Sequence, residues 1–194
     1  MDLKGHQVIL ASGSPRRREL LAGLNIDFEV DTGNTFDEVY APGTPSDTIP
    51  SLMSEGKSFG FHRELSENEI LVTSDTLVIC PEGDIVMGKP KDRDDAFRML
   101  RILSGRSHKV ITAVTVRTLR GFKTLSDTAV VHFKHLSDDE IFYYIDNFKP
   151  YDKAGAYGIQ EWIGYMGIDR IEGSFYTIMG FPVHLVYDML KEVL

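Results

Sequence analysis

The sequence predicts a globular α/β fold that combines β-strands with helices. Segments with the two-residue hydrophobic period of strands, or short apolar runs, occur between segments with the 3.6-residue period of helices. Its 194 residues suffice for one domain, or for a two-lobed unit with a sizeable core. Apolar or alternating runs typical of strands occur at residues 8–10, 26–30, 70–79, 85–87, 110–119 and 127–135. Apolar residues at helical spacing occur at residues 20–24, 49–60, 96–103, 141–148 and 186–194.

Composition and charge exclude several classes of partner. The net charge of −8 means that the surface as a whole should repel nucleic-acid polymers and anionic membranes. No stretch approaches the roughly 20 apolar residues of a membrane span, and the N-terminus has no long apolar core of a signal peptide. Cys80, the single cysteine, lies in an apolar run and suggests a buried thiol in a reducing compartment. We therefore expect a cytoplasmic protein.

The segment from Leu10 to Leu21 is predicted to leave a strand, pass through a small-residue loop and enter a helix. Ser14 is a suitable N-cap, and Pro15 fits the first helical position. The first turn then holds Arg16–Arg18, although the helix dipole favours acidic residues there. Residues 92–96 open another helix with the expected acidic turn. The arginines are explained either by a bound phosphate group or by a solvated basic face.

Two carboxylates, in different sequence settings, are further candidates for a functional site. Asp75 lies inside the apolar run at 70–79, where an unpaired carboxylate would be costly, so it serves either a function or a structural ion pair. Glu38 follows Asp37 in a turn-rich loop. Adjacent carboxylates of this kind mark a solvated loop or, in a minority of cases, a metal or catalytic site.

Two lysines are candidates because of where they lie. Lys57 is on the helix predicted over residues 47–62, where a solvated position is the ordinary alternative. Lys89 stands between a glycine and a proline at a strand end, after a turn predicted over Pro81–Asp84.

The C-terminal half carries a capping box and a segment of small residues. Ser137–Glu140 is typical of a helix start. Asp152–Gln160 combines small residues, which let a backbone approach a ligand, with polar side chains. We expect strands at 165–171 and 174–178 and a final helix after Gly180–Pro182.

Together these segments resemble the Maf family of nucleoside triphosphate pyrophosphatases. The matching segments occur in the family's order and cover most of the chain: Leu10–Leu21, Ser74–Thr76, Gly88–Pro90, Leu103–Gly105, Ile111–Val114 and Asp152–Gln160. The segment at 152–160 resembles the branch that acts on dTTP and UTP, rather than the branches for 7-methyl-GTP or CTP. Glu161 and Trp162 depart from the pattern, because the family more often has glycine there.

The resemblance implies hydrolysis of dTTP and UTP to the monophosphate and pyrophosphate with Mg²⁺ or Mn²⁺, and leaves modified pyrimidine nucleotides open. By position, the phosphate-binding residues would be Ser12, Arg16 and Arg17. The reaction-centre residues would be Asp75, Lys57, Lys89 and Glu38, with Asp75 and Glu38 as metal ligands. The residues at the family's specificity positions are Arg16, Thr76 and Gln160.

The resemblance also implies an α/β fold: a long, mixed, bent β-sheet flanked by helices, with two lobes around a central cleft, as in ITPase-like proteins. The whole chain, residues 1–194, would be a single domain of this kind, usually found as a homodimer.

The residue types suit this chemistry. Attack at the α-phosphorus develops negative charge that arginines, lysines and a metal stabilise. Asp75 would hold the metal or orient water, and Gln160 offers a donor and an acceptor to a uracil or thymine edge. The alternative is a non-enzymatic nucleotide-binding regulator of cell division, which would need Arg16 and Arg17 but no carboxylate beside them. A P-loop kinase or ATPase is excluded, because the Gly-x-x-x-x-Gly-Lys-Ser/Thr motif is absent.

Overall fold

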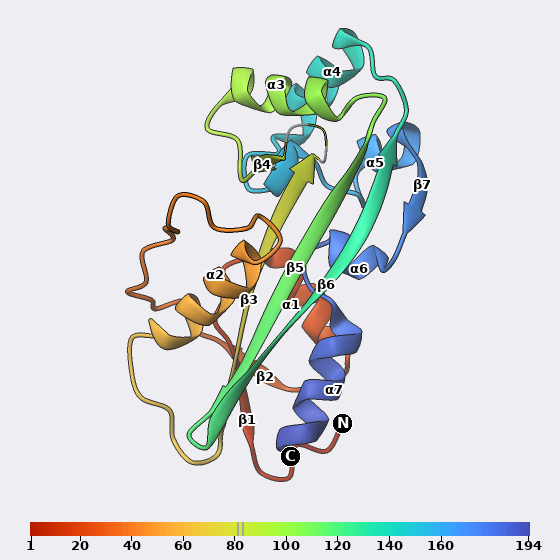
Figure 1. Cartoon of the computed structure of the whole chain (residues 1–194). Helices are drawn as coiled ribbons and strands as arrows, with labels where there is room; N and C mark the ends of the chain where they lie inside the picture. Colours follow the sequence, from red (N-terminus) through yellow and green to blue (C-terminus); the bar gives the residue numbers. More distant parts are fainter. Residues whose placement is uncertain (81, 83) are drawn as a thin grey trace. The chain divides into compact units, whose positions relative to one another are not determined.

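The computed structural model describes residues 1–80, 82 and 84–194, which form a seven-stranded sheet with helices packed on it (Figure 1). The N-terminal elements are β1 (Gln7–Leu10), α1 (Pro15–Ala22), β2 (Phe28–Val30) and α2 (Ile49–Phe59). The central elements are β3 (Glu69–Cys80), β4 (Ile85–Met87), α3 (Arg93–Leu103), β5 (Ser107–Thr118) and β6 (Gly121–Phe133). The C-terminal elements are α4 (Asp138–Phe148), the 3-10 helix η1 (Ala154–Ala156), α5 (Trp162–Gly167), β7 (Ile168–Glu172), α6 (Phe175–Ile178) and α7 (Val183–Val193).

The sheet is mixed, with strand order β2-β1-β3-β5-β6-β7 and β4 beside β3. β1 runs parallel to both of its neighbours, with Val8 opposite Phe28 on one side and Ile70 on the other. β4 is antiparallel to β3, and β7 is antiparallel to β6. The α/β prediction with a mixed sheet flanked by helices is therefore confirmed.

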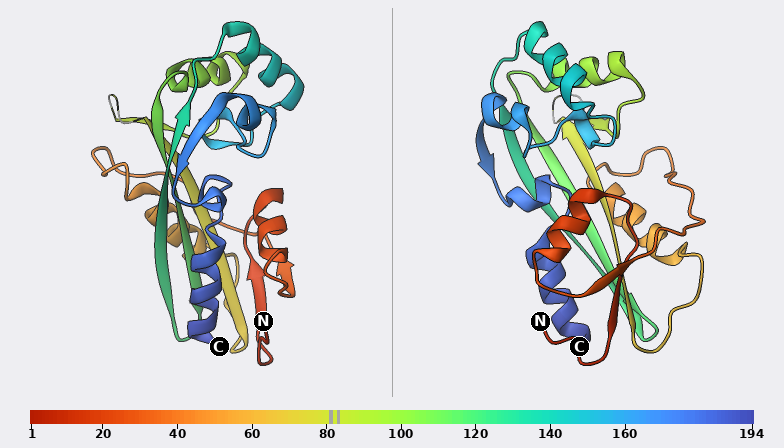
Figure 2. Two further views of the ribbon diagram at one scale, coloured as in Figure 1. Left: turned by 90° about the vertical axis from the view of Figure 1, so that its right-hand side faces the viewer. Right: turned by 180° about the vertical axis from the view of Figure 1, so that it is seen from behind.

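The chain divides into two compact units, of which the first contains residues 1–75, 112–127 and 180–194. Alternate residues of a strand face opposite sides of a sheet. Leu10 packs in an apolar core with Leu21 of α1 and Leu190 of α7, while its neighbour Ile9 joins a second cluster with Phe61, just after α2. In this unit α1 and α7 cover one side of the strands, and α2 lies on the other (Figure 2).

The second unit contains residues 76–111 and 128–179. In it, α3 packs against α4 and η1. Phe97 of α3 stacks on Phe142 of α4 with ring centres 4.5 Å apart, and Arg93 donates to both carboxylate oxygens of Asp146 at 2.7 and 2.9 Å. α4 begins at the predicted capping box, because the Ser137 side chain accepts from the Glu140 backbone while the Glu140 side chain accepts from Ser137.

Most predicted elements are confirmed, and one region is wrong. The predicted strand at 174–178 contains the short helix α6, and residues 165–167 belong to α5. Short segments rich in aromatic and β-branched residues suit strands and buried helices alike, so tertiary packing decides between them. In the turn predicted over Pro81–Asp84, Pro81 and Gly83 lie outside the described residues.

The single cysteine and the helices relate to two further expectations from the sequence. Cys80 is buried with only 1% of its surface exposed, as predicted for a structural thiol. Among the described residues, none of the helices is both long and apolar enough to cross a membrane.

Candidate active site

The loop between β1 and α1 is tied to the sheet at its start. Ala11 N donates to Val72 O of β3 at 2.9 Å, and the buried Ser12 hydroxyl accepts from Ser14 N at 3.3 Å. Ser14 occupies the N-cap position of α1 and Pro15 the first helical position, as predicted. However, the Ser14 side chain makes no capping bond within the described residues.

Arg17 fixes this loop to two other segments of the first unit. Its Nε donates to Gly180 O at 2.9 Å, and its Nη1 donates to Ser74 O at 2.8 Å and to Ser12 Oγ at 3.2 Å. Burial lowers the pKa of the Arg17 guanidinium, while the nearby Asp75 carboxylate opposes that shift. Arg17 therefore places a half-buried positive charge at the start of α1 and links the segments around it.

Asp75, Lys57 and Glu38 form one cluster in the same unit. Lys57 Nζ of α2 donates to Asp75 Oδ1 of β3 at 2.6 Å and lies 3.1 Å from Glu38 Oε1. The Asp75 side chain is 14% exposed and the Glu38 side chain 60% exposed. The carboxylate predicted to be costly inside a strand is therefore paired, and its partner is itself one of the predicted reaction-centre residues.

The electrostatic environment of Asp75 is dominated by burial. Burial raises the pKa of the Asp75 carboxyl above its usual value, and the neighbouring Glu38 raises it further. Lys57 and Arg17 lower it, through their charges and through the hydrogen bond from Lys57. A carboxylate held with a raised pKa near two cations is a stronger base than an exposed aspartate, yet is stabilised in its ionised form.

The loop that carries Glu38 is docked on α2. Asn34 Nδ2 donates to Lys57 O at 2.6 Å, and Phe36 N donates to Asn34 Oδ1 at 2.8 Å. Phe36 lies where side chains at Gly56 and Gly60 would be, since a Cβ at Gly56 would come within 2.2 Å of its ring and a Cβ at Gly60 within 2.6 Å of its own Cβ. This packing explains why glycine occurs at position 56 in α2 and at position 60 just after it.

The remaining predicted site residues belong to the second unit. Thr76 follows Asp75 directly on β3 and is half-buried. Lys89 is exposed in the loop after β4, and this loop is held to η1 because Gly155 N donates to Gly88 O at 3.0 Å. Gln160 is half-buried, and its Oε1 atom is enclosed without a hydrogen-bond partner among the described residues.

The structure thus brings together a first group of predicted residues within one unit: Ser12, Arg16, Arg17, Glu38, Lys57 and Asp75. The second group, Thr76, Lys89 and Gln160, lies in the other unit. Sequence reasoning assigned no supporting role to Phe36, Ser74 or Gly180, nor to Tyr144, whose hydroxyl accepts from Gly158 N at 2.9 Å near Gln160. A tyrosine on the apolar face of a helix was the one available signal, because a buried phenol hydroxyl normally needs a partner.

Asp75 and Glu38 are the residues predicted to hold a divalent cation. Both carboxylates contact the same Lys57 ammonium. Carboxylate oxygens are the ligands that hard cations such as Mg²⁺ or Mn²⁺ prefer. Within the described part of the chain, no cluster of three or more His, Cys, Asp or Glu side chains surrounds a metal position. A cation held by this pair would have to take its other ligands from water and substrate phosphates.

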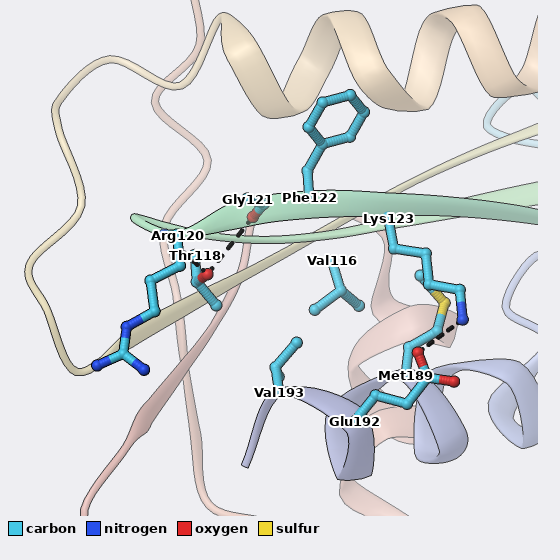
Figure 3. A pocket seen from close by; sticks show the side chains of 9 residues that line it. All are labelled: Val116, Thr118, Arg120, Gly121, Phe122, Lys123, Met189, Glu192 and Val193. Atoms are coloured by element: carbon cyan, nitrogen blue, oxygen red, sulfur yellow. Dashed lines mark hydrogen bonds and ion pairs between the residues drawn. The ribbon is translucent and has the colours of Figure 1, made fainter.

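A separate pocket of the first unit involves none of these residues. It has a volume of about 360 Å³ and lies between the β5–β6 hairpin and the end of α7 (Figure 3). Lys123 Nζ donates to Glu192 Oε2 at 2.6 Å at its edge. The residues that line it are Val116, Thr118, Arg120, Gly121, Phe122, Lys123, Met189, Glu192 and Val193.

Comparison with known proteins identifies the family. A family model described as Maf-like protein matches residues 7–193. The chain belongs to the Maf family. It is 45% identical over 98% of its length to a protein of Porphyromonas gingivalis, covering 96% of that relative, and 47% identical to one of Flavobacterium johnsoniae, with 98% and 97% coverage. Both relatives are named dTTP/UTP pyrophosphatase.

The fold of this Maf protein extends beyond close relatives. The Ham1 protein of Staphylococcus aureus superposes with a TM-score of 0.51 over 97% of this chain and 100% of that one, at 14% sequence identity. This likeness confirms the predicted fold relationship and, at such low identity, carries information on architecture alone.

Proposed function

We propose that this Maf protein is a nucleoside triphosphate pyrophosphatase that hydrolyses dTTP and UTP to the monophosphate and pyrophosphate. The observation that carries the proposal is the cluster in which Lys57 joins the carboxylates of Asp75 and Glu38, close to Arg17. Full-length relatives with 45–47% identity bear the name dTTP/UTP pyrophosphatase, which supports the substrate class.

The residues of the first unit would act on the phosphates. The β1–α1 loop and the arginines Arg16 and Arg17 would bind the triphosphate, because arginine forks and loop N–H groups suit phosphate oxygens. Asp75 would hold the metal or orient the attacking water, and its partly enclosed carboxylate lies beside the cationic residues that would bind the phosphates. Lys57 would hold Asp75 ionised and in place.

The cofactor of this reaction would be Mg²⁺ or Mn²⁺ held by Asp75 and Glu38. When bound, the cation would neutralise charge on the substrate phosphates. Lys89 would add positive charge toward the leaving pyrophosphate, and Thr76 and Gln160 would contact the nucleoside, as their positions in the family's motifs imply.

Assembly and location are further parts of the proposal. The family resemblance supports a homodimer, which sedimentation velocity would test. A single buried cysteine supports a reducing compartment such as the cytoplasm, and a fluorescent fusion would test this.

The decisive experiment measures pyrophosphate release from a panel of nucleoside triphosphates with Mg²⁺ or Mn²⁺. We expect dTTP and UTP to be the best substrates. Asp75→Asn should lower kcat by at least about 100-fold while UTP still binds, because the carboxylate that would hold the metal or orient water is lost but the cationic residues remain. The matched control, Asp94→Asn, removes an exposed carboxylate in the first turn of α3 and should keep full activity.

Either of two results would contradict the proposal. Normal turnover by Asp75→Asn would show that Asp75 has no role in the reaction. Tight UTP binding by the unaltered protein without any pyrophosphate release would instead favour the non-enzymatic nucleotide-binding regulator.

A further inference from the structure

A tight turn carries Gln160. Glu161 N donates to Gly158 O at 3.0 Å, which closes a four-residue turn with Gln160 in its third position. The hydroxyl of Tyr144, a fully buried residue of α4, accepts from Gly158 N at 2.9 Å and donates to Glu161 Oε2 through a short hydrogen bond. One buried hydroxyl therefore holds both ends of the turn that presents Gln160.

The second carboxylate oxygen of Glu161 is also held. Glu161 Oε1 lies 3.0 Å from Lys153 Nζ, and the Lys153 side chain is only 9% exposed. A Cβ at Gly158 would lie 2.9 Å from Glu161 Cδ and 3.0 Å from Lys153 Cε. The buried lysine and the half-buried carboxylate thus fill the space beside the turn next to Gly158.

Helix α5 supports the turn from its other end. Gly164 N donates to Glu161 O at 2.9 Å, and a Cβ at Gly164 would lie 1.8 Å from Ile159 O. The helix backbone therefore packs directly on the turn backbone. With contacts from α4, from Lys153 and from α5, the turn has little room to move.

The Gln160 side chain has an unfilled acceptor. Its Oε1 is enclosed and has no hydrogen-bond partner among the described residues. Buried acceptors are normally paired, so rotation of the Gln160 side chain on its fixed turn toward a donor on a ligand would pair an oxygen that the described residues leave without a partner. The N3–H of uracil or thymine is such a donor, whereas N3 of cytosine is an acceptor and would face the oxygen unfavourably.

We propose that Tyr144 and Glu161 are positioning residues for base selection: with Lys153, they hold the turn at residues 158–161 so that Gln160 Oε1 accepts a hydrogen bond from the imide N–H of uracil or thymine. The inference rests on the proposed function for its ligand class. It adds to that function a reason why one pyrimidine is chosen over the other, located in side chains that do not touch the phosphates.

The test compares equilibrium binding of the non-hydrolysable α,β-methylene analogues of UTP and CTP by isothermal titration calorimetry. We expect the unaltered protein to favour the UTP analogue. Tyr144→Phe, which removes one oxygen atom, should reduce this preference by roughly tenfold, mainly by weakening the UTP analogue, because the acceptor of Gln160 is no longer held in place. Glu161→Gln should shift the preference in the same direction.

The control variant is Tyr143→Phe, on the same helix. Tyr143 is 49% exposed, and its ring contacts Trp162 edge-on at 4.8 Å, a contact that phenylalanine keeps. We expect its base preference to be unchanged. A role in stability alone would lower the melting temperature of Tyr144→Phe without changing the ratio of the two affinities.

The inference is overturned if folded Tyr144→Phe and Glu161→Gln both keep the original ratio, or if the unaltered protein binds the two analogues equally well. If Tyr144→Phe does not fold, the Glu161→Gln ratio decides. Pyrophosphate release, measured separately, tests the proposed function. A protein that prefers the UTP analogue but hydrolyses no triphosphate would contradict the function and leave the inference standing.

Discussion

At the scale of single residues, Asp75 illustrates how a costly placement can serve chemistry. Burial raises the pKa of its carboxyl, and the charges of Lys57 and Arg17 lower it. An exposed aspartate would be ionised but weakly basic, and a buried one without a partner would be protonated. The lysine pairing keeps the carboxylate ionised in an environment that strengthens it as a base.

The first prediction concerns the pH dependence set by Lys57. Replacing it with methionine removes the charge that favours ionised Asp75, so the pKa of Asp75 should rise further. Because Asp75 would act in its ionised form, the acid limb of the kcat/KM profile should move to higher pH. Lys57→Arg keeps the charge and should leave that limb near its original position. If the acid limbs of the methionine variant and the unaltered protein coincide, Lys57 does not control the ionisation of Asp75.

The second prediction concerns His108, a buried residue of β5. Its Nε2 shares a hydrogen bond of 2.7 Å with Tyr157 Oη, while Nδ1 is enclosed with no partner among the described residues. Burial lowers the pKa of His108 to about 3, and the nearby His132 adds to the effect. The folded protein therefore keeps this imidazole neutral, whereas the unfolded chain protonates it near pH 6.5.

The sign of the effect follows from linkage. Between pH 6.5 and about 3 the unfolded state binds a proton that the native state does not, so acidification favours unfolding. In the unaltered protein, His108 should lower the free energy of unfolding by up to about 1.4 kcal/mol for each pH unit of acidification in this range. Urea denaturation should show that His108→Gln lacks this contribution. The exposed His135→Gln is the control. Parallel stability curves for unaltered protein and His108→Gln would refute the assignment.

At the scale of elements, α2 and the loop before it together position the Lys57 and Glu38 side chains. α2 supplies Lys57, and the loop supplies Glu38 and is docked through Phe36 against Gly56 and Gly60. The distance between the lysine and the second carboxylate therefore depends on a contact between an aromatic ring and a helix backbone. Glycine is needed here for space, and its backbone freedom is not used, since Gly56 lies within the helix.

The third prediction tests that contact with Gly56→Ala. The new methyl group would lie 2.2 Å from the Phe36 ring, so the ring must move and Glu38 with it. We expect a loss of about 1–3 kcal/mol in the free energy of unfolding and at least a roughly tenfold lower kcat, because a displacement of about 1 Å can have large kinetic effects.

The control for this prediction is the Phe36→Ala background. Without the ring, Gly56→Ala should be neutral or stabilising by up to about 1 kcal/mol, because alanine is the better helix former. A double-mutant cycle from denaturation curves measures this change of sign. If Gly56→Ala is equally destabilising in both backgrounds, Phe36 does not occupy the position assigned to it.

The elements also show what the sequence could and could not predict. Periodicity located the helix at 93–103 and the strand containing Asp75, because their apolar faces are long enough to fix the period. It misassigned residues 174–178, where four residues of helix are too few to show a period. The positions of short elements are set by tertiary packing, which a local pattern does not contain.

At the scale of the whole molecule, the sequence could point to residue types for a candidate site, but it could not give their geometry. The arginines opposed to the helix dipole and the carboxylate inside an apolar run broke local rules, and such violations mark functional sites. No local pattern linked Glu38 to Lys57, because Phe36 and Gly56 join them across 20 residues of sequence. The contacts of Tyr144 were hidden for the same reason, since its spacing is that of an ordinary core residue.

The charge of the whole chain leads to the last prediction. Its 21 basic and 29 acidic residues give a net charge of −8, so cationic groups such as Arg16 and Arg17 are a local exception on an acidic molecule. A short anion can reach such a group, whereas a polymer would bring many more phosphates against the acidic surface. Fluorescence anisotropy with a labelled DNA or RNA duplex should therefore show no binding up to about 10 μM protein, even at 50 mM salt. UTP added to the same sample should still bind. Salt-sensitive binding of the duplex would instead require a basic surface that competes with the net negative charge.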